Sequence, residues 1–283
     1  MPKNSKSNTP FQDKYQIRED QSVELLKELH ILTRDGKLNQ DSRRKLKQIY
    51  HLFQFIQPLL KQLENSNICL VDHGAGKSYL GFILYDLFFK HLPKDTSHIY
   101  GIENRAELVQ KSEKLALKLG FAGMSFLNLS VSDSIGSRAI PDKVDIVTAL
   151  HACNTATDDA IRFALNKHAK YIVLVPCCQA EVAAVLKKNK AWQNNILGEM
   201  WHHPIHGREF GSHITNVLRS LQLEANGYSV MVTELVGFEH SLKNELIIAT
   251  ATNKPNAVAA KKLNDLLTLL GLTELKHQFF IQP

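Results

Sequence analysis

Short apolar runs alternate with longer amphipathic stretches between about residues 66 and 253, and this alternation constrains the fold most. Several of the connecting stretches carry helical patterns, such as Glu107–Leu119 and Asp158–His168. Strand–helix alternation of this kind predicts parallel strands joined by crossover helices. The apolar runs are ICLVD (68–72), HIYGIE (98–103), MSFLNL (124–129), VDIVTAL (144–150), YIVLV (171–175), VMVTELV (230–236) and ELIIATA (245–251).

The last two runs differ from the first five because only a short segment, with Gly237 and His240, separates them. A connection this short has no room for a crossover helix, so we expect these two strands to pair antiparallel. Five parallel strands and a terminal antiparallel pair predict a Rossmann-like α/β fold of seven strands, with helices on both faces of the sheet.

The segments outside this alternation have patterns of their own. Residues 1–10 are polar without apolar periodicity, which predicts a disordered lead-in. Within residues 11–66, apolar side chains recur at three- and four-residue steps, which predicts two amphipathic helices broken near Thr33–Asp41. We expect the sheet domain to span 67–253, and 254–283 to form a C-terminal helix and tail.

The composition is that of an ordinary globular chain. Of 283 residues, 44% are hydrophobic and 22% are charged, which excludes wholesale disorder. No apolar run approaches the roughly 18 residues of a membrane span, and the polar start predicts no signal peptide. Four cysteines are too few for a disulfide scaffold, so we expect a cytoplasmic location with reduced thiols.

The positive charge is concentrated at the two ends of the chain. Residues 1–66 hold 12 Lys and Arg against 8 Asp and Glu, and residues 254–283 hold 4 against 2, whereas residues 67–253 hold 18 of each. Basic flanks attract polyanions, which favours RNA as a partner. The alternative is that these Lys and Arg side chains are ordinary solvent-exposed charges with no binding role, which explains the excess equally well.

The first apolar run ends in a glycine-rich loop. A P-loop would need a glycine at Val71, and a dinucleotide fingerprint would need one at Tyr79, so neither motif is complete. What remains is D-x-G-x-G, the pattern of S-adenosylmethionine-binding loops, before a helix that we expect to begin near Lys77. A glycine-rich turn without a ligand is the alternative. The predicted cofactor-binding residues here are Asp72, His73, Gly74, Ala75 and Gly76.

The next two runs also end in polar residues. Glu103, followed by Asn104, ends the second run, and a carboxylate there can accept both hydrogens of a ribose diol. Ser132 and Asp133 follow the third run, where a side chain could meet the adenine amino group. The alternatives are a helix-capping or solvent-facing role for Glu103 and an N-cap role for the Ser132–Asp133 pair.

Together, the D-x-G-x-G loop, Glu103 and the closing antiparallel pair resemble a class I S-adenosylmethionine-dependent methyltransferase. Two further motifs, LHACNTATD (150–158) and VPCC (175–178), resemble the group that contains the acceptor-stem tRNA ribose 2'-O-methyltransferases and the methyltransferase-like proteins. The segment EHSLKN (239–244) also resembles that group's Thr-Pro-Lys-Asn stretch. The resemblance covers roughly residues 66–252. Asn154 and Gln179 depart from it, since the group often has Gly and His there.

The resemblance implies S-adenosylmethionine as cofactor, with Leu150 among its contacts, and an acceptor bound where the fourth and fifth strands end. His151 or Asp158 is the candidate base, and Lys243 matches a lysine of the family. The alternative for the first two is a loop-stabilising network in which Asp158 caps the following helix. The predicted acceptor-side residues are Lys77, Cys153, Asn154, Pro176, Cys177 and Cys178.

We predict no metal site. No C-x-x-C pair exists, and the adjacent Cys177 and Cys178 are poor joint zinc ligands. An insertion between Lys187 and Ile214 contains His202, His203 and His206, which we interpret as polar residues at the rim of the pocket. We expect a helix at about 215–226 after this insertion.

The leading interpretation is a methyltransferase that acts on RNA. Methylation of a protein or a small molecule stays open, because the neutral core suits it equally well. A non-catalytic scaffold that binds RNA or a protein through the same fold also stays open, as does a nucleotide hydrolase using Gly76-Lys77-Ser78, although the missing first glycine argues against the hydrolase.

The basic N-terminal flank yields the first prediction. Replacing Lys and Arg by Gln within residues 1–66 should weaken RNA binding and flatten its salt dependence, because fewer counterions are then released. Binding curves at several salt concentrations measure both effects. Unchanged binding would remove the support for an RNA clamp in this flank.

Overall fold

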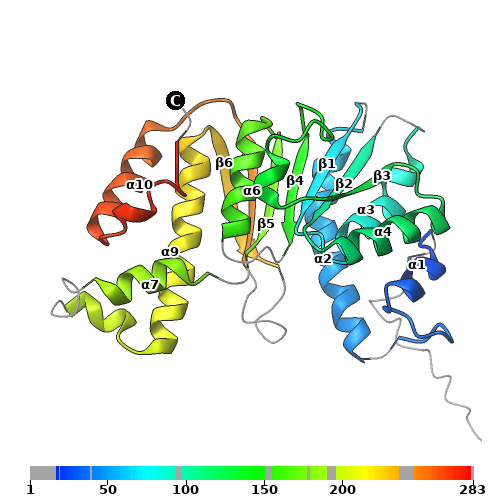
Figure 1. Cartoon of the computed structure of the whole chain (residues 1–283), viewed down its shortest axis with the longest axis horizontal. Helices are drawn as coiled ribbons and strands as arrows, with labels where there is room; N and C mark the ends of the chain where they lie inside the picture. The colour runs from blue at the N-terminus through cyan, green and yellow to red at the C-terminus, as the bar shows by residue number, and fades with distance from the viewer. Residues whose placement is uncertain are drawn as a thin grey trace, which may run out of the picture.

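A seven-stranded sheet of order β3-β2-β1-β4-β5-β7-β6 forms the centre of the molecule (Figure 1). The computed structural model describes residues 17–18, 20–38, 40–64, 66–93, 97–150, 155–176, 179–189, 196–235 and 245–281. Strands β1 to β5 run parallel, and β7 pairs antiparallel with both β5 and β6, which confirms the predicted fold class. The strands are β1 Cys69–His73, β2 His98–Glu103, β3 Met124–Asn128, β4 Ile146–Leu150, β5 Tyr171–Val175, β6 Tyr228–Glu234 and β7 Glu245–Ala251.

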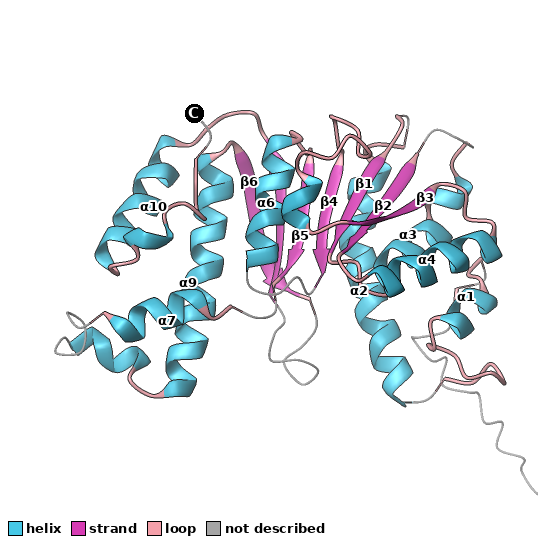
Figure 2. Ribbon diagram, in the orientation of Figure 1, coloured by secondary structure: helices cyan, strands magenta, loops and turns pink. Residues whose placement is uncertain are grey.

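Helices cover both faces of the sheet (Figure 2). Within the described ranges, no helix is both long enough and apolar enough to cross a membrane. The α-helices are α1 Val23–Glu28, α2 Gln40–Lys61, α3 Tyr79–Leu87, α4 Ala106–Leu119, α5 Val131–Ser134, α6 Thr155–Asn166, α7 Glu181–Lys188, α9 Pro204–Ala225 and α10 Ala257–Leu269. The 3-10 helices are η1 Phe89–His91, η2 Ile196–Trp201 and η3 Thr273–Leu275.

The sheet separates two hydrophobic cores. In β5, Tyr171 and Val173 belong to one core, and Ile172 and Leu174 belong to the other, as the two-residue period of a strand requires. The first core takes its helical side chains from α1, α2, α3 and α4, and the second takes them mainly from α5 and α6. Strands β1, β4, β5 and β7 are buried on both faces, which explains their near-continuous apolar runs, whereas β6 at the edge of the sheet is largely exposed.

The N-terminal helices pack on the sheet rather than apart from it. Leu25 of α1 and Phe53 of α2 are fully buried in the same core as Leu70 of β1. The Tyr171 hydroxyl in β5 also donates to Gln62 Oε1 just after α2, at 2.6 Å. The boundary between 11–66 and 67–253 stays a prediction, and the expected lead-in, 1–10, lies outside the described residues.

Three helix boundaries differ from those expected. The interruption between α1 and α2 begins after Glu28 and so is longer than the predicted one. Helix α3 begins at Tyr79 instead of near Lys77, because Ser78 has a left-handed backbone. Helix α9 begins at Pro204, well before residue 215, and its proline lies in the first turn, where the missing N–H costs nothing.

Helices α7, α9 and α10 form a third hydrophobic core, and the C-terminal tail packs against it. Gln222 of α9 donates from Nε2 to the backbone oxygens of Gln278 and Phe280, at 3.2 and 3.1 Å. Gln278 in turn donates from Nε2 to Glu181 Oε2 of α7, at 2.7 Å. Side-chain amides thus satisfy the backbone of a segment that has no regular structure of its own.

The contact between α7 and α9 yields a stability prediction. A Cβ on Gly211 would lie 2.7 Å from Ala183 Cβ and 2.8 Å from Ala183 N, so Gly211→Ala must push the two helices apart. We expect a loss of about 1–3 kcal/mol in the free energy of unfolding, despite the better helix propensity of alanine. Urea unfolding measures it. Gly136→Ala is the control, since no heavy atom lies within 4 Å of its added Cβ, and equal stability of both variants would contradict this packing.

Candidate functional site

The candidate site lies at the carboxyl edge of the sheet, where the strand order reverses. The chain runs outward from β1 through β2 to β3 and then returns to β4, which pairs with β1 on its other side. Such a reversal leaves the loops after β1 and β4 pointing apart, and ligands of open α/β sheets bind in the resulting crevice. The described residues singled out at the ends of β1, β2, β4 and β5, from Asp72 to Gly76, Glu103, Leu150 and Pro176, belong to this edge.

The glycine-rich loop after β1 bends twice through left-handed backbone. Gly74 and Gly76 have φ of 64° and 59°, which a side chain would oppose. The bend is held by Ala75 N donating to Ile102 O at 3.0 Å and by Ser78 N donating to Ala75 O at 2.7 Å. A Cβ on Gly76 would come within 3.8 Å of Arg105 Nη2, so the loop lies against the end of β2.

Glu103, at the end of β2, meets this loop directly. Its Oε2 accepts from Gly76 N at 2.8 Å, and the side chain is 7% exposed. Arg105 donates from its backbone N and from Nε to Oε1, at 3.0 and 2.9 Å. Burial alone raises the pKa of Glu103, but the hydrogen bonds from Arg105 and Gly76 outweigh it, so this pKa lies below its ordinary value. The carboxylate is therefore charged at neutral pH.

Two further ionisable groups are buried beside the loop. Asp72 accepts from Thr148 Oγ1 of β4 at 2.7 Å, and burial raises its pKa to about 7 against that hydrogen bond. Burial lowers the pKa of His73 to about 3, so its ring is neutral. Ser134 Oγ donates to Val131 O, so we assign the His73 proton to Nε2, which contacts Ser134 Oγ at 3.1 Å.

The residues after β3 form a helix cap. Ser130 Oγ accepts from Asp133 N at 3.0 Å and donates to Asp133 Oδ2 at 2.6 Å, which is a reciprocal capping arrangement at the start of α5. Ser132 and Asp133 are both exposed, as is Asn104 after β2. The N-cap of α5 is thus Ser130 and neither Ser132 nor Asp133, while the adenine contact stays a prediction.

The acceptor side is described only in part. Pro176 is buried directly after β5, and Lys77 is exposed beside the glycine-rich loop. Leu150, a predicted cofactor contact, is half-buried at the end of β4. Apart from Asp158, the other predicted acceptor-side and catalytic residues lie outside the described residues, and they are His151, Cys153, Asn154, Cys177, Cys178 and Lys243.

Asp158, the second candidate base, is hydrogen-bonded to Arg219, a residue that the sequence analysis did not single out. Arg219 of α9 donates to Asp158 Oδ1 from Nε at 2.7 Å and to Oδ2 from Nη2 at 2.9 Å. The arginine side chain is fully buried and that of Asp158 is 6% exposed. The sequence did contain a signal for this pair, because Arg219 stands among the apolar positions of the amphipathic helix α9. A catalytic role for Asp158 stays a prediction.

The histidines of the insertion stand close together without forming a metal centre. The ring centroids of His202 and His203 are 5.2 Å apart, and those of His203 and His206 are 5.4 Å apart. Across the described part of the chain, no group of three or more His, Cys, Asp and Glu side chains could hold a metal ion.

Comparison with known proteins assigns the chain to a family. A model described as a methyltransferase domain matches residues 44–185, which is about half of the chain. The chain belongs to this family. The match begins inside α2, ends in α7 and includes the glycine-rich loop and Glu103. The prediction of a methyltransferase is confirmed at this level, whereas the finer tRNA-enzyme resemblance stays a prediction.

Curated relatives of this methyltransferase-domain protein are longer chains. A glutathione S-transferase C-terminal domain-containing protein homolog from Drosophila pseudoobscura pseudoobscura is 24% identical over 202 residues, which cover 63% of this chain and 32% of the relative. The protein of that name from Bos taurus is 26% identical over 157 residues, which cover 55% and 22%. The chain thus spans a third or less of the length of these relatives.

Similar solved structures include methyltransferases with different substrates. An rRNA methylase from Streptococcus thermophilus is 9% identical, with 70% of this chain and 94% of that chain covered and a TM-score of 0.46. Magnesium protoporphyrin IX methyltransferase from Synechocystis PCC 6803, with S-adenosylhomocysteine bound, is 14% identical, with 81% and 94% covered and a TM-score of 0.46. These likenesses concern the fold alone.

The buried Asp72 yields a pH prediction. Its folded pKa of about 7 exceeds the ordinary 3.8, so the folded state binds more protons between these values, and this group's contribution to stability falls as pH rises. Asp72→Asn removes that dependence. The free energy of unfolding of the variant relative to the natural protein should therefore rise by roughly 3 kcal/mol between about pH 4 and pH 8. Urea unfolding across this range measures it, and a pH-independent difference would contradict the buried, uncompensated carboxyl.

Proposed function

We propose that this protein is an S-adenosylmethionine-dependent methyltransferase that methylates a nucleophilic oxygen or nitrogen of RNA. The methyl donor is S-adenosylmethionine, as membership of the methyltransferase-domain family and the class I resemblance imply. The observation that carries the proposal is the hydrogen bond of 2.8 Å between Gly76 N and Glu103 Oε2. This bond brings the glycine bend and the Glu103 carboxylate together. A bound nucleoside needs both, because the bend lets it approach the backbone and the carboxylate accepts hydrogen bonds from its ribose.

The described residues fit this cofactor. The backbone of Gly74 and Gly76 presents no side chain to an incoming ligand, and Glu103 is a buried carboxylate that the diol of a ribose can donate to. Arg105 donates to the same carboxylate, and its side chain is 58% exposed. When bound, the cofactor supplies a sulfonium methyl group, which passes to the acceptor while the sulfur keeps the bonding electron pair and the acceptor loses a proton.

The RNA substrate is proposed from the sequence and from charge. The motifs at 150–158 and 175–178 resemble those of acceptor-stem tRNA ribose methyltransferases, and residues 1–66 carry the basic excess. An oxygen acceptor needs a base, and Asp158 already accepts two hydrogen bonds from Arg219. We therefore favour His151 as the base. Methylation of a protein or small molecule, or binding without turnover, are outcomes that the test separates.

A transfer assay tests the proposal. The full chain is incubated with S-adenosylmethionine that carries a labelled methyl group and with fractionated cell extract. We expect label in an RNA fraction, and we expect S-adenosylhomocysteine to raise the unfolding temperature. Label in a protein or small-molecule fraction instead would show that the substrate is not RNA. Stabilisation of the protein by S-adenosylhomocysteine without label in any fraction would favour a non-catalytic scaffold. Stabilisation by ATP alone would overturn the cofactor assignment.

Glu103 yields a binding prediction. Glu103→Gln replaces the charged acceptor by a neutral amide, so S-adenosylhomocysteine affinity should fall by about 10- to 100-fold, the usual effect of losing hydrogen bonds to a charged group. Isothermal titration calorimetry measures it. Glu107→Gln is the matched control, because Glu107 is an exposed acid in the first turn of α4. Equal losses in both variants would contradict a diol-binding role for Glu103.

A further inference from the structure

We propose that Asn216 and Arg219 of α9 are positioning residues that set the geometry of the acceptor side of the site. They belong to a cluster of five polar side chains that we call the α9 node, made of the buried Asp158, Gln179, Asn216 and Arg219 and the half-buried Glu245. The proposal rests on the methyl transfer proposed above, but its structural part can be tested separately.

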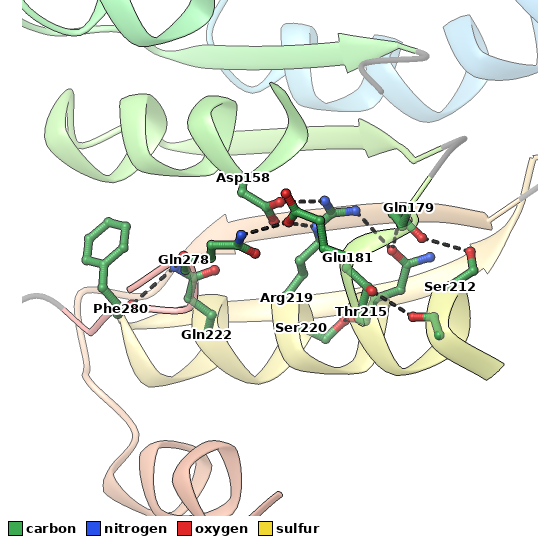
Figure 3. Close-up of polar contacts among 12 residues, drawn as sticks. Asp158, Gln179, Glu181, Ser212, Thr215, Arg219, Ser220, Gln222, Gln278 and Phe280 are labelled. Atoms are coloured by element: carbon green, nitrogen blue, oxygen red, sulfur yellow. Dashed lines mark hydrogen bonds and ion pairs between the residues drawn. The ribbon is translucent and has the colours of Figure 1, made fainter. Parts of the chain in front are cut away.

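The node is centred on a buried charge that cannot be neutralised by deprotonation. Arg219 is 0% exposed, and a guanidinium stays protonated in proteins, so its charge must be matched locally. Asp158 matches it with two parallel hydrogen bonds, the strong bidentate form of this pair (Figure 3). The pair holds the first turn of α6 against the middle of α9.

Asn216 extends the pair to two more segments. Its Oδ1 accepts from Arg219 Nη1 at 3.3 Å and lies 2.9 Å from the side-chain amide of Gln179, which also contacts Arg219 Nη1. Its Nδ2 donates to Glu245 Oε2 at 2.8 Å, at the first residue of β7. Ser212, one turn earlier on α9, is hydrogen-bonded through its Oγ to the other end of that amide, at 2.7 Å. One asparagine thus connects α6, α9, the segment after β5 and the start of β7.

The position of the node along the chain points to the acceptor side. Three members of the node lie outside α9, and each follows, within four residues, a segment with predicted acceptor-side or catalytic residues. Asp158 follows 151–154, Gln179 follows 177–178, and Glu245 follows 236–244. The cofactor-binding loop after β1 and Glu103 at the end of β2 contribute no side chain to the node.

A polar cluster is a costly way to gain stability alone. Well-packed apolar side chains of the same volume often replace a buried ion pair without loss, whereas fully satisfied polar networks fix one arrangement of the segments that they join. Methyl transfer demands such an arrangement, because displacement of the acceptor by about 1 Å can reduce turnover about 100-fold. The node therefore fixes Asp158, Gln179 and Glu245, the described residues that follow the segments with the predicted acceptor-side residues.

Asn216→Leu tests this role, because it removes both polar atoms at similar volume and leaves the Arg219–Asp158 pair in place. Hydrogen exchange in peptides covering residues 179–183 and 245–250 should rise about tenfold, as expected when hydrogen bonds to these segments are lost. Methyl transfer to the RNA fraction that accepts label should fall at least tenfold. S-adenosylhomocysteine affinity should stay within twofold of that of the natural protein, which a general loss of structure would not allow.

Asn264→Leu is the matched control. Asn264 is a half-buried asparagine of α10 whose Nδ2 donates to Ala260 O at 2.9 Å, and it lies outside the node. We expect natural exchange and natural turnover in this variant. Unchanged exchange in Asn216→Leu, or raised exchange with natural turnover, would overturn the proposal. If no fraction accepts label, the proposed function fails, and the exchange data still decide whether Asn216 holds the two segments.

A second variant covers the case in which Asn216→Leu does not fold. Asn216→Asp keeps an acceptor for Gln179 and Arg219 but replaces the donor to Glu245 by a second carboxylate. Exchange should then rise in the peptide covering 245–250 and stay natural in the one covering 179–183. A uniform rise in both peptides would show that the node acts as a general stabiliser and not through separate links to each segment.

Discussion

The structure depends on one constraint, the reversal of strand order between β1 and β4 in a parallel sheet. Parallel strands present all their carboxyl ends at one edge, and in open α/β sheets ligands bind at such a reversal. The glycine-rich loop and Glu103 lie on one side of the reversal. The ends of β4 and β5 lie on the other, so strand order alone brings the two halves of the proposed site to one edge.

Two buried carboxyl groups at this edge differ in their protonation. Glu103 stays charged because the Gly76 amide and Arg105 donate to it. Asp72 accepts from the Thr148 hydroxyl, and burial raises its pKa to about 7. The difference follows from the number of donors that each carboxyl meets, since burial penalises the charged form of both.

Local patterns predicted much of this molecule. Each apolar run is a strand within a few residues, because most of these strands are buried on both faces and therefore consist almost entirely of apolar residues. The hydrogen bond between Gly76 and Glu103 was not predicted, because it depends on the pairing of β1 with β2. Arg105 was missed although it stands two residues after Glu103, and Arg219 was missed because its partner Asp158 lies 61 positions away. The start of α9 was missed because the insertion before it has little periodicity.

The sequence by itself determined the sheet, its faces and the chemistry of the loop after β1, since these depend on periodicity and on residue types at adjacent positions. Only the tertiary structure decided that the carboxylate of Asp158 is held by Arg219 and that Asn216 joins three separate segments. The physical reason is that a hydrogen bond depends on direction and on distances of about 3 Å. Such distances arise between residues far apart in the chain only after the helices have packed.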